Sequence, residues 1–114
     1  MASVLGSATA KAAERIAKRS QPHGSIVLIL SLIGIVIQVI QFIQSNCREK
    51  KRQRLKLFRE PTEAHRIMVR RVCRDRCQGE FRVYADSVAD AVLAEAAKAK
   101  EADCLAVMAE SEAS

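Results

Sequence analysis

An uncharged run of 18 residues, from Ile26 to Ile43, constrains the fold of this chain more than any other feature. Ile and Val fill ten of its positions, but the run is longer than an ordinary β-strand. As an α-helix it would measure about 27 Å, close to the roughly 30 Å hydrocarbon thickness of a bilayer. A helix also satisfies its own backbone hydrogen bonds in lipid, which a single strand cannot do. The run therefore predicts a transmembrane helix, with 24–46 as its bounds.

A buried helix inside a soluble domain is the alternative. A chain of 114 residues can build one core, but the other segments are too basic or too rich in alanine to surround a helix that is apolar on all sides. Aromatic residues are also few, with three Phe, one Tyr and no Trp. We therefore expect an all-α chain: a single transmembrane helix with a short N-terminal amphipathic helix, two extramembrane C-terminal helices and little independent core.

Small and polar residues inside the run recur at spacings of three and four, which places them on one side of a helix. In lipid, small residues let two helices approach closely, and a glutamine amide can hydrogen-bond to a neighbouring helix. Headgroup polarity could explain the residues near the end of the span, but not those near its middle. We predict that this polar stripe faces a partner helix, either a second copy or another subunit. Its members are Ser31, Gly34, Gln38, Gln41 and Ser45.

Charge divides the remaining chain into segments. Residues 1–23 form a weakly basic N-terminal segment with the pattern of an amphipathic helix that could lie on an anionic membrane surface. Residues 45–82 hold 13 Lys/Arg against 5 Asp/Glu, whereas residues 83–114 hold 2 against 7. The predicted units after the span are a basic juxtamembrane helix extension (47–60), an Arg-rich helix (61–79) and an Ala-rich acidic helix and tail (80–114).

Helix boundaries follow from the breakers in the sequence. Nothing interrupts a helix between Gln44 and Arg59, so we expect the spanning helix to continue out of the membrane. Pro61 suits the first turn of a second helix that runs to Gln78, and Gly79 should close that helix as a left-handed cap. A third helix should then run from about Phe81 or Ser87 to Met108.

The basic residues on the C-terminal side of the span outnumber those before it, seven against four within about 15 residues. The positive-inside rule then places the C-terminus in the cytoplasm, matrix or stroma. Because these residues adjoin a membrane, anionic phospholipid or an acidic partner is favoured over nucleic acid. Three of the arginines, spaced by four, could instead form a solvated face. The predicted set is Arg48, Lys50, Lys51, Arg52, Arg54, Lys56, Arg59, Arg66, Arg70 and Arg74.

The four cysteines form no CxxC pair and no zinc-site spacing. We expect Cys47, Cys73, Cys77 and Cys104 to be free thiols that pack as small apolar residues, with acylation of Cys47 as a weaker alternative. His65 with Cys73 and Cys77 lacks a fourth metal ligand at a sensible spacing. We therefore predict no catalytic, cofactor-binding or metal residues.

The chain also lacks the HExxH, nucleophile-elbow, P-loop and glycine-rich fingerprints of common enzymes. We therefore expect a non-catalytic accessory or structural subunit that packs against other subunits of a multi-subunit membrane complex. The basic segments on both sides of the span favour the mitochondrial inner membrane, in an assembly of the respiratory or ATP-synthase type. The alternative is a small viral membrane-associated virion protein that links lipid to coat protein or genome.

Overall fold

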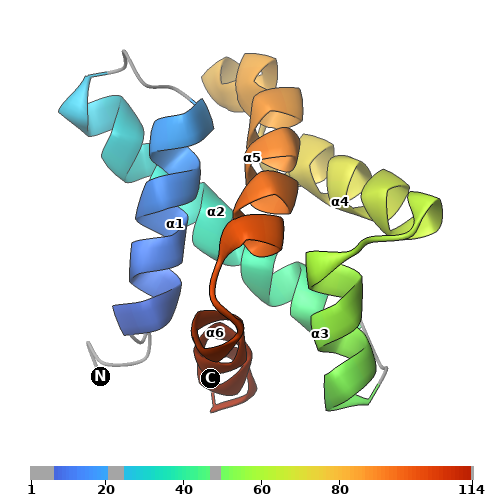
Figure 1. The fold of residues 1–114 in the computed structure, drawn as a ribbon. Coiled ribbons are helices and arrows are strands. Elements are labelled where there is room, and N and C mark those ends of the chain that lie inside the picture. The colour runs from blue at the N-terminus through green and yellow to red at the C-terminus, as the bar shows by residue number, and fades with distance from the viewer. Residues whose placement is uncertain (1–6, 21–24, 47–49, 114) are drawn as a thin grey trace.

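A computed structural model describes residues 7–20, 25–46 and 50–113. All regular elements within these ranges are helical, which confirms the all-α class (Figure 1). The elements are α1 (Ser7–Ser20), α2 (Ile26–Asn46), α3 (Lys51–Arg59), α4 (Glu63–Arg76), the 3₁₀ helix η2 (Gly79–Tyr84), α5 (Ala85–Lys98) and α6 (Glu101–Ala113).

Helix α2 is the longest of these elements, and one of its faces is covered by the rest of the chain. Helices α1 and α4 pack directly on α2, and α5 packs on both α1 and α4. The N-terminal amphipathic helix is thus present as α1, but its apolar side lies against other helices of the same chain. The buried residues of α2 are Leu32, Val36, Ile37, Val39, Ile40, Ile43 and Gln44.

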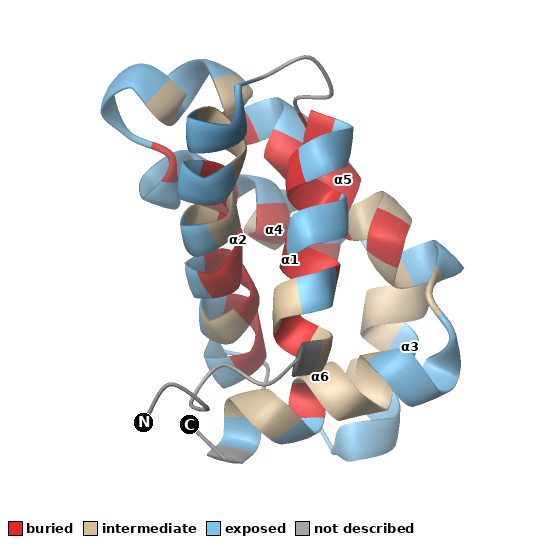
Figure 2. Ribbon diagram, turned by 90° about the vertical axis from the view of Figure 1, so that its left-hand side faces the viewer, coloured by how far each residue is buried: buried red, intermediate tan, exposed pale blue. Residues whose placement is uncertain are grey.

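The described residues form a continuous core, so the expectation of little independent core is wrong for them. The core joins α2 to Ala13 and Ile16 of α1, Val69 of α4 and Val88 of α5. Alanines at the contact let the helix backbones approach closely, so short helices bury apolar surface without aromatic bulk. The cover is one-sided: the buried residues of α2 lie along one side of the helix, and only 33% of its apolar stretch is buried (Figure 2).

Helices α2 and α3 are separate, which corrects the predicted continuous helix from Gln44 to Arg59. Lys50 has an extended backbone (φ −61°, ψ 154°), and α3 begins at the next residue. The change of direction brings α3 against α5 and α6, where Phe58 packs on the core. A straight continuation would have carried Phe58 away from that core. Cys47 and Arg48 lie outside the described residues.

Helix α4 begins two residues later than predicted, because Thr62 caps it. The Thr62 hydroxyl accepts a hydrogen bond from the His65 N–H at 3.2 Å, and Pro61 precedes the cap. Gly79 has a positive φ of 61°, as predicted, but it does not cap α4, whose C-cap is Cys77 with an extended backbone (φ −89°, ψ 99°). Gly79 instead starts η2, which turns the chain into α5.

The predicted third helix is two helices, because the chain turns at Ala99. Ala99 has an extended backbone (φ −63°, ψ 152°), and its N–H donates to the Glu95 carbonyl at 2.8 Å. The Arg59 guanidinium donates to the Ala99 carbonyl at 2.5 Å. The turn lets α6 pack on α1 and buries Met108, which an unbroken helix would have carried away from the core.

Candidate membrane and partner interface

The outward face of α2 carries the predicted polar stripe. Ser31, Gly34, Gln38 and Ser45 are exposed, and Gln41 is half-buried. A Cβ placed on Gly34 would meet no atom within 4 Å, so the helix backbone is open to close approach at that position. The structure thus places the stripe on one accessible face, and its contact with a partner stays a prediction.

Large apolar side chains flank this stripe and are also uncovered. Ile26 is 76% exposed, Val27 74% and Leu30 61%, and Phe42 near the other end of the helix is 38% exposed. An exposed apolar surface of this kind is typical of a membrane or protein contact. Among the described residues, α2 is the one helix long and apolar enough to cross a membrane. The part of the chain that the structure describes therefore has one candidate membrane-spanning helix.

The C-terminal end of the stripe borders α4 and α6. Gln38, Gln41 and Ser45 line a shallow hollow with Phe42, Arg76 of α4 and Ser111 of α6. The Arg76 guanidinium carbon lies 4.6 Å from the centroid of the Phe42 ring, within cation–π range. Sequence reasoning did not single out Arg76, because its place beside α2 depends on how α4 folds back.

The predicted basic residues divide into two groups. The first group is exposed and makes no ion pair with any residue in the described ranges: Lys50, Lys51, Arg52, Lys56 and Arg66. In the second group, Arg54 pairs with Glu112 at 2.9 Å and Arg59 bonds the Ala99 carbonyl. The first group is therefore the part of the predicted set that remains available to an external anion.

The second group also contains Arg70 and Arg74, which have acidic neighbours within the chain. Arg70 lies 3.7 Å from Asp90, and Arg74 lies 3.4 Å from Asp86. Both aspartates belong to α5, so the chain supplies acidic neighbours for these two arginines itself. All four side chains are more than half exposed, so each pair contributes little to stability.

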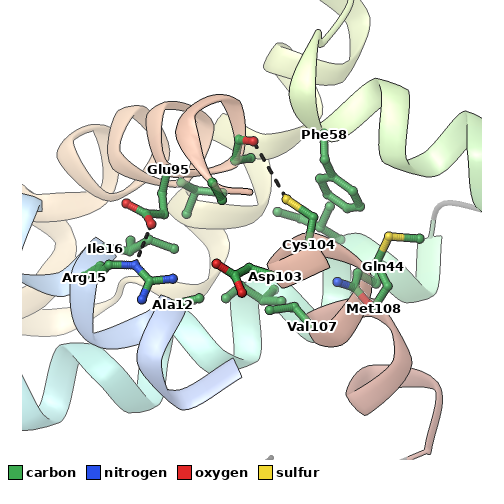
Figure 3. A pocket seen from close by; sticks show the side chains of 15 residues that line it. Ala12, Arg15, Ile16, Gln44, Phe58, Glu95, Asp103, Cys104, Val107 and Met108 are labelled. Carbon is green, nitrogen blue, oxygen red and sulfur yellow. Dashed lines mark hydrogen bonds and ion pairs between the residues drawn. The ribbon is translucent and has the colours of Figure 1, made fainter. Parts of the chain in front are cut away.

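A buried carboxylate on α5 makes the closest ion pair of the structure described here. The Glu95 side chain is 11% exposed, and its Oε2 lies 2.6 Å from Arg15 Nε of α1 (Figure 3). Its Oε1 lies 3.2 Å from Arg19 Nε. Sequence reasoning missed Glu95, although it lies on the same side of α5 as the apolar residues Val88 and Val92. A single acidic residue on the apolar side of a helix was the sequence signal that could have indicated a buried ion pair.

A second carboxylate, from α6, binds the N-terminal turn of α1. Glu110 accepts hydrogen bonds from the Ala8 N–H (3.1 Å), the Thr9 N–H (2.8 Å) and the Thr9 hydroxyl (2.7 Å). Burial opposes ionisation of Glu110, but the bonds from Thr9 and Ala8 outweigh it and lower the pKa of this carboxyl below its usual value. The two carboxylates together attach α1 to α5 and α6.

A cavity of about 70 Å³ lies where α1, α2, α3, α5 and α6 meet (Figure 3). Its lining is mainly apolar and includes Ile40, Ile43 and Met108. Gln44 also lines it, and the Gln44 Oε1 has no hydrogen-bond partner among the described residues. Glu95 and Arg15 lie at the same cavity, so the α1 attachment forms part of its wall.

The described thiols are free and fill space in the structure, as predicted. Burial, with smaller contributions from Cys77, Asp86 and Asp90, raises the pKa of Cys73 to about 12. Burial also raises the pKa of Cys77 and of Cys104. These three thiols therefore stay protonated at neutral pH and are poor nucleophiles.

His65, the suggested third member of a metal set, is a packing residue. Burial lowers the pKa of His65, and its ring meets the Phe58 ring edge-on at 5.5 Å between centroids. The residues placed by the structure contain no group of three or more His, Cys, Asp or Glu side chains suited to a metal ion.

No family model, curated protein or solved structure matches this chain. The fold and its surfaces define an all-α chain with one candidate membrane-spanning helix, covered on one face and open on the other.

Proposed function

We propose that this chain is a non-catalytic, single-pass accessory subunit of a multi-subunit membrane complex. Helix α2 crosses the bilayer, and its polar stripe contacts a helix of a neighbouring subunit. The supporting observation is the outward face of α2, where Gly34 and Gln38 are exposed between large uncovered apolar side chains. Exposure of such a surface to water is unfavourable. In a membrane, lipid covers the apolar side chains, and a partner helix can hydrogen-bond to the polar ones.

Crossing the bilayer requires α2 to separate from the helices that cover it. Helices α1, α4 and α5 carry charged side chains on their outer faces, such as Arg15, Arg70 and Asp90. Charged residues are expensive in the hydrocarbon region, so these helices cannot stay beside α2 along the span. The bundle is then the closed state of the chain. In the open state, the amphipathic helices lie at the membrane surface.

The exposed basic residues of α3 support the orientation and the location. Lys51, Arg52 and Lys56 follow the span directly and remain exposed, so the C-terminal side faces the cytoplasm or the matrix under the positive-inside rule. These residues also suit anionic phospholipid. The proposed location is the mitochondrial inner membrane, in an assembly of the respiratory or ATP-synthase type. Protease protection of a C-terminal tag in intact mitochondria tests the location, and its persistence in mitoplasts, whose outer membrane is ruptured, tests the orientation.

The Gln38→Leu variant tests the stripe. It removes an amide from the outward face without reducing apolarity, so membrane insertion should be unchanged. Recovery of co-purifying subunits in mild detergent should fall roughly 3- to 20-fold, the scale of one hydrogen bond between helices in lipid. Gln53→Leu makes the same chemical change at an exposed position of α3 and should have no effect.

Two results decide the proposal. Full recovery of partners by the Gln38 variant refutes the role of the stripe. If differently tagged copies of the chain co-purify with each other and nothing else does, the partner is a second copy and the accessory-subunit assignment is wrong.

The virion-protein alternative rests on the same exposed basic residues of α3. It predicts binding to nucleic acid that weakens steeply with salt, because phosphate contacts release counterions. Membrane subunits, in contrast, should stay associated through salt washing. A salt titration of both associations separates the two functions.

A further inference from the structure

Helix α1 is attached to the bundle through charge as well as through apolar packing. Glu95 is 8% exposed as a residue, and each of its carboxylate oxygens faces an arginine of α1. The side chains of Arg15 and Arg19 are 45% and 40% exposed. The carboxylate is therefore covered, while both guanidinium groups can still be reached from solvent.

The arginines come from successive turns of α1 and converge on one anion. Guanidinium groups placed in this way suit phosphate oxygens as well as carboxylate oxygens, because both anions accept several N–H bonds. Other charges near the pair are few. Lys11 is exposed on the same helix, and Glu14 pairs with Lys18 at 3.7 Å. Asp103 of α6 lines the cavity beside Arg15.

Under this contact, α1 covers part of the buried face of α2. Ala13 and Ala17 of α1 are fully buried, and Ile16 is 3% exposed. They belong to the same core as Leu32 and Val36 of α2. Detachment of α1 would therefore uncover apolar surface on the helix that is proposed to enter the membrane.

We infer that Arg15 and Arg19 form a binding site for the phosphate of an anionic phospholipid, and that Glu95 occupies this site in the closed bundle. At an anionic membrane, lipid phosphates replace Glu95 and release α1 from α5. The covered face of α2 is then exposed to lipid, and α2 inserts. The inference rests on the proposed membrane crossing and adds the ligand and the event that permit it.

A membrane surface favours this exchange for a physical reason. Anionic headgroups attract basic residues within about a Debye length, and many phosphates are present there at once. The released Glu95 carboxylate regains water. In bulk solution, Glu95 prevails because the fold keeps it next to both arginines.

Vesicle insertion tests the exchange. The folded full chain is added to vesicles of phosphatidylcholine alone or mixed with phosphatidylglycerol, and insertion is read as flotation that resists alkaline carbonate. The unaltered chain should insert roughly 30-fold more into the anionic vesicles, the scale of two basic residues at an anionic surface. Inorganic phosphate added to phosphatidylcholine vesicles should not reproduce this gain.

The Glu95→Gln variant should insert into phosphatidylcholine vesicles about as well as the unaltered chain inserts into anionic ones. Asp90→Asn removes the same charge from the same helix, but there the partner is Arg70 of α4. It should behave like the unaltered chain. Hydrogen exchange without vesicles tests whether α1 is released: its amides should exchange roughly tenfold faster or more in the Glu95 variant but not in the Asp90 variant, while α5 stays protected.

The double variant Arg15→Gln/Arg19→Gln separates opening from lipid binding. It should open like the Glu95 variant yet gain roughly 30-fold less from anionic lipid, because the two arginines are gone while the basic residues of α3 remain. Equal insertion of the unaltered chain into both vesicles, with no effect of Glu95→Gln, overturns the exchange and leaves the membrane span intact. An equal gain from free phosphate overturns lipid as the ligand. Failure of the chain and all variants to insert into any vesicle refutes the proposed function itself.

Discussion

Leu30 and Leu32 of α2 provide a matched test of the one-sided cover. They are the same residue two positions apart on one helix, but Leu30 is 61% exposed and Leu32 is fully buried. Leu32→Ala should therefore destabilise the closed bundle far more than Leu30→Ala. A helix surrounded uniformly by lipid or detergent predicts no such difference.

The magnitude follows from the exposures. A Leu→Ala change removes roughly three methylene-sized groups at about 0.8 kcal/mol each when fully buried, or about 2.4 kcal/mol. Because Leu30 is 61% exposed, only the buried remainder of its side chain contributes, and Leu30→Ala should lower the free energy of unfolding by about 1 kcal/mol. Leu32 loses the full transfer term and also leaves a cavity, so we expect about 3 to 5 kcal/mol.

Urea titration followed by circular dichroism measures both free energies of unfolding. At micromolar concentration, with detergent below its critical micelle concentration, the two variants should differ by at least about 2 kcal/mol. Above that concentration the difference should shrink, because α2 leaves the bundle for the micelle. Equal losses below the critical micelle concentration would refute the burial of Leu32 in the core of the bundle.

Two further predictions concern titratable groups. The low pKa of Glu110 means that its stabilisation is complete above the ordinary value of 4.5 and is lost as the pH falls through the lower folded value. Urea titrations from neutral to acid pH should thus show that the free energy of unfolding falls less with pH in Glu110→Gln than in the control Glu101→Gln. An identical dependence of this free energy on pH in both variants would contradict the contact with α1. In a Cys47→Ser background, N-ethylmaleimide should modify half-buried Cys104 before buried Cys73, whose pKa is raised to about 12, and mass mapping that finds Cys73 first would refute its burial.

The parts of the fold that local pattern decides were predictable. The uncharged run predicted the apolar body of α2, although the helix ends at Asn46 and does not continue to Arg59. The spacing of the small and polar residues predicted that they share one face of the helix. The left-handed conformation of Gly79 was predictable because glycine has no Cβ and adopts a positive φ more readily than other residues. Each of these features depends on residues close together in the sequence.

The breaks before Lys51 and at Ala99 were not predictable in the same way. Neither site holds a glycine or a proline, so the sequence offers no stop signal there. Packing decides both: Phe58 reaches the core only if the chain turns before α3, and Met108 is buried only if it turns before α6. The contact of Arg15 with Glu95 joins residues 80 positions apart, so only the folded arrangement shows it.

The composition of α2 also explains why sequence alone does not separate a membrane span from a core helix, since both environments favour apolar residues. The distinction lies in how much of the helix the chain can cover. In the described structure α1 and α4 cover one face directly, while Ile26, Val27 and Leu30 remain exposed on the other. Helix α3 turns away toward α5 and α6, so it adds no cover to that face. Under the proposed function, lipid and a partner helix complete the environment of α2, because the exposed Gly34 and Gln38 suit a neighbouring helix in lipid better than lipid alone.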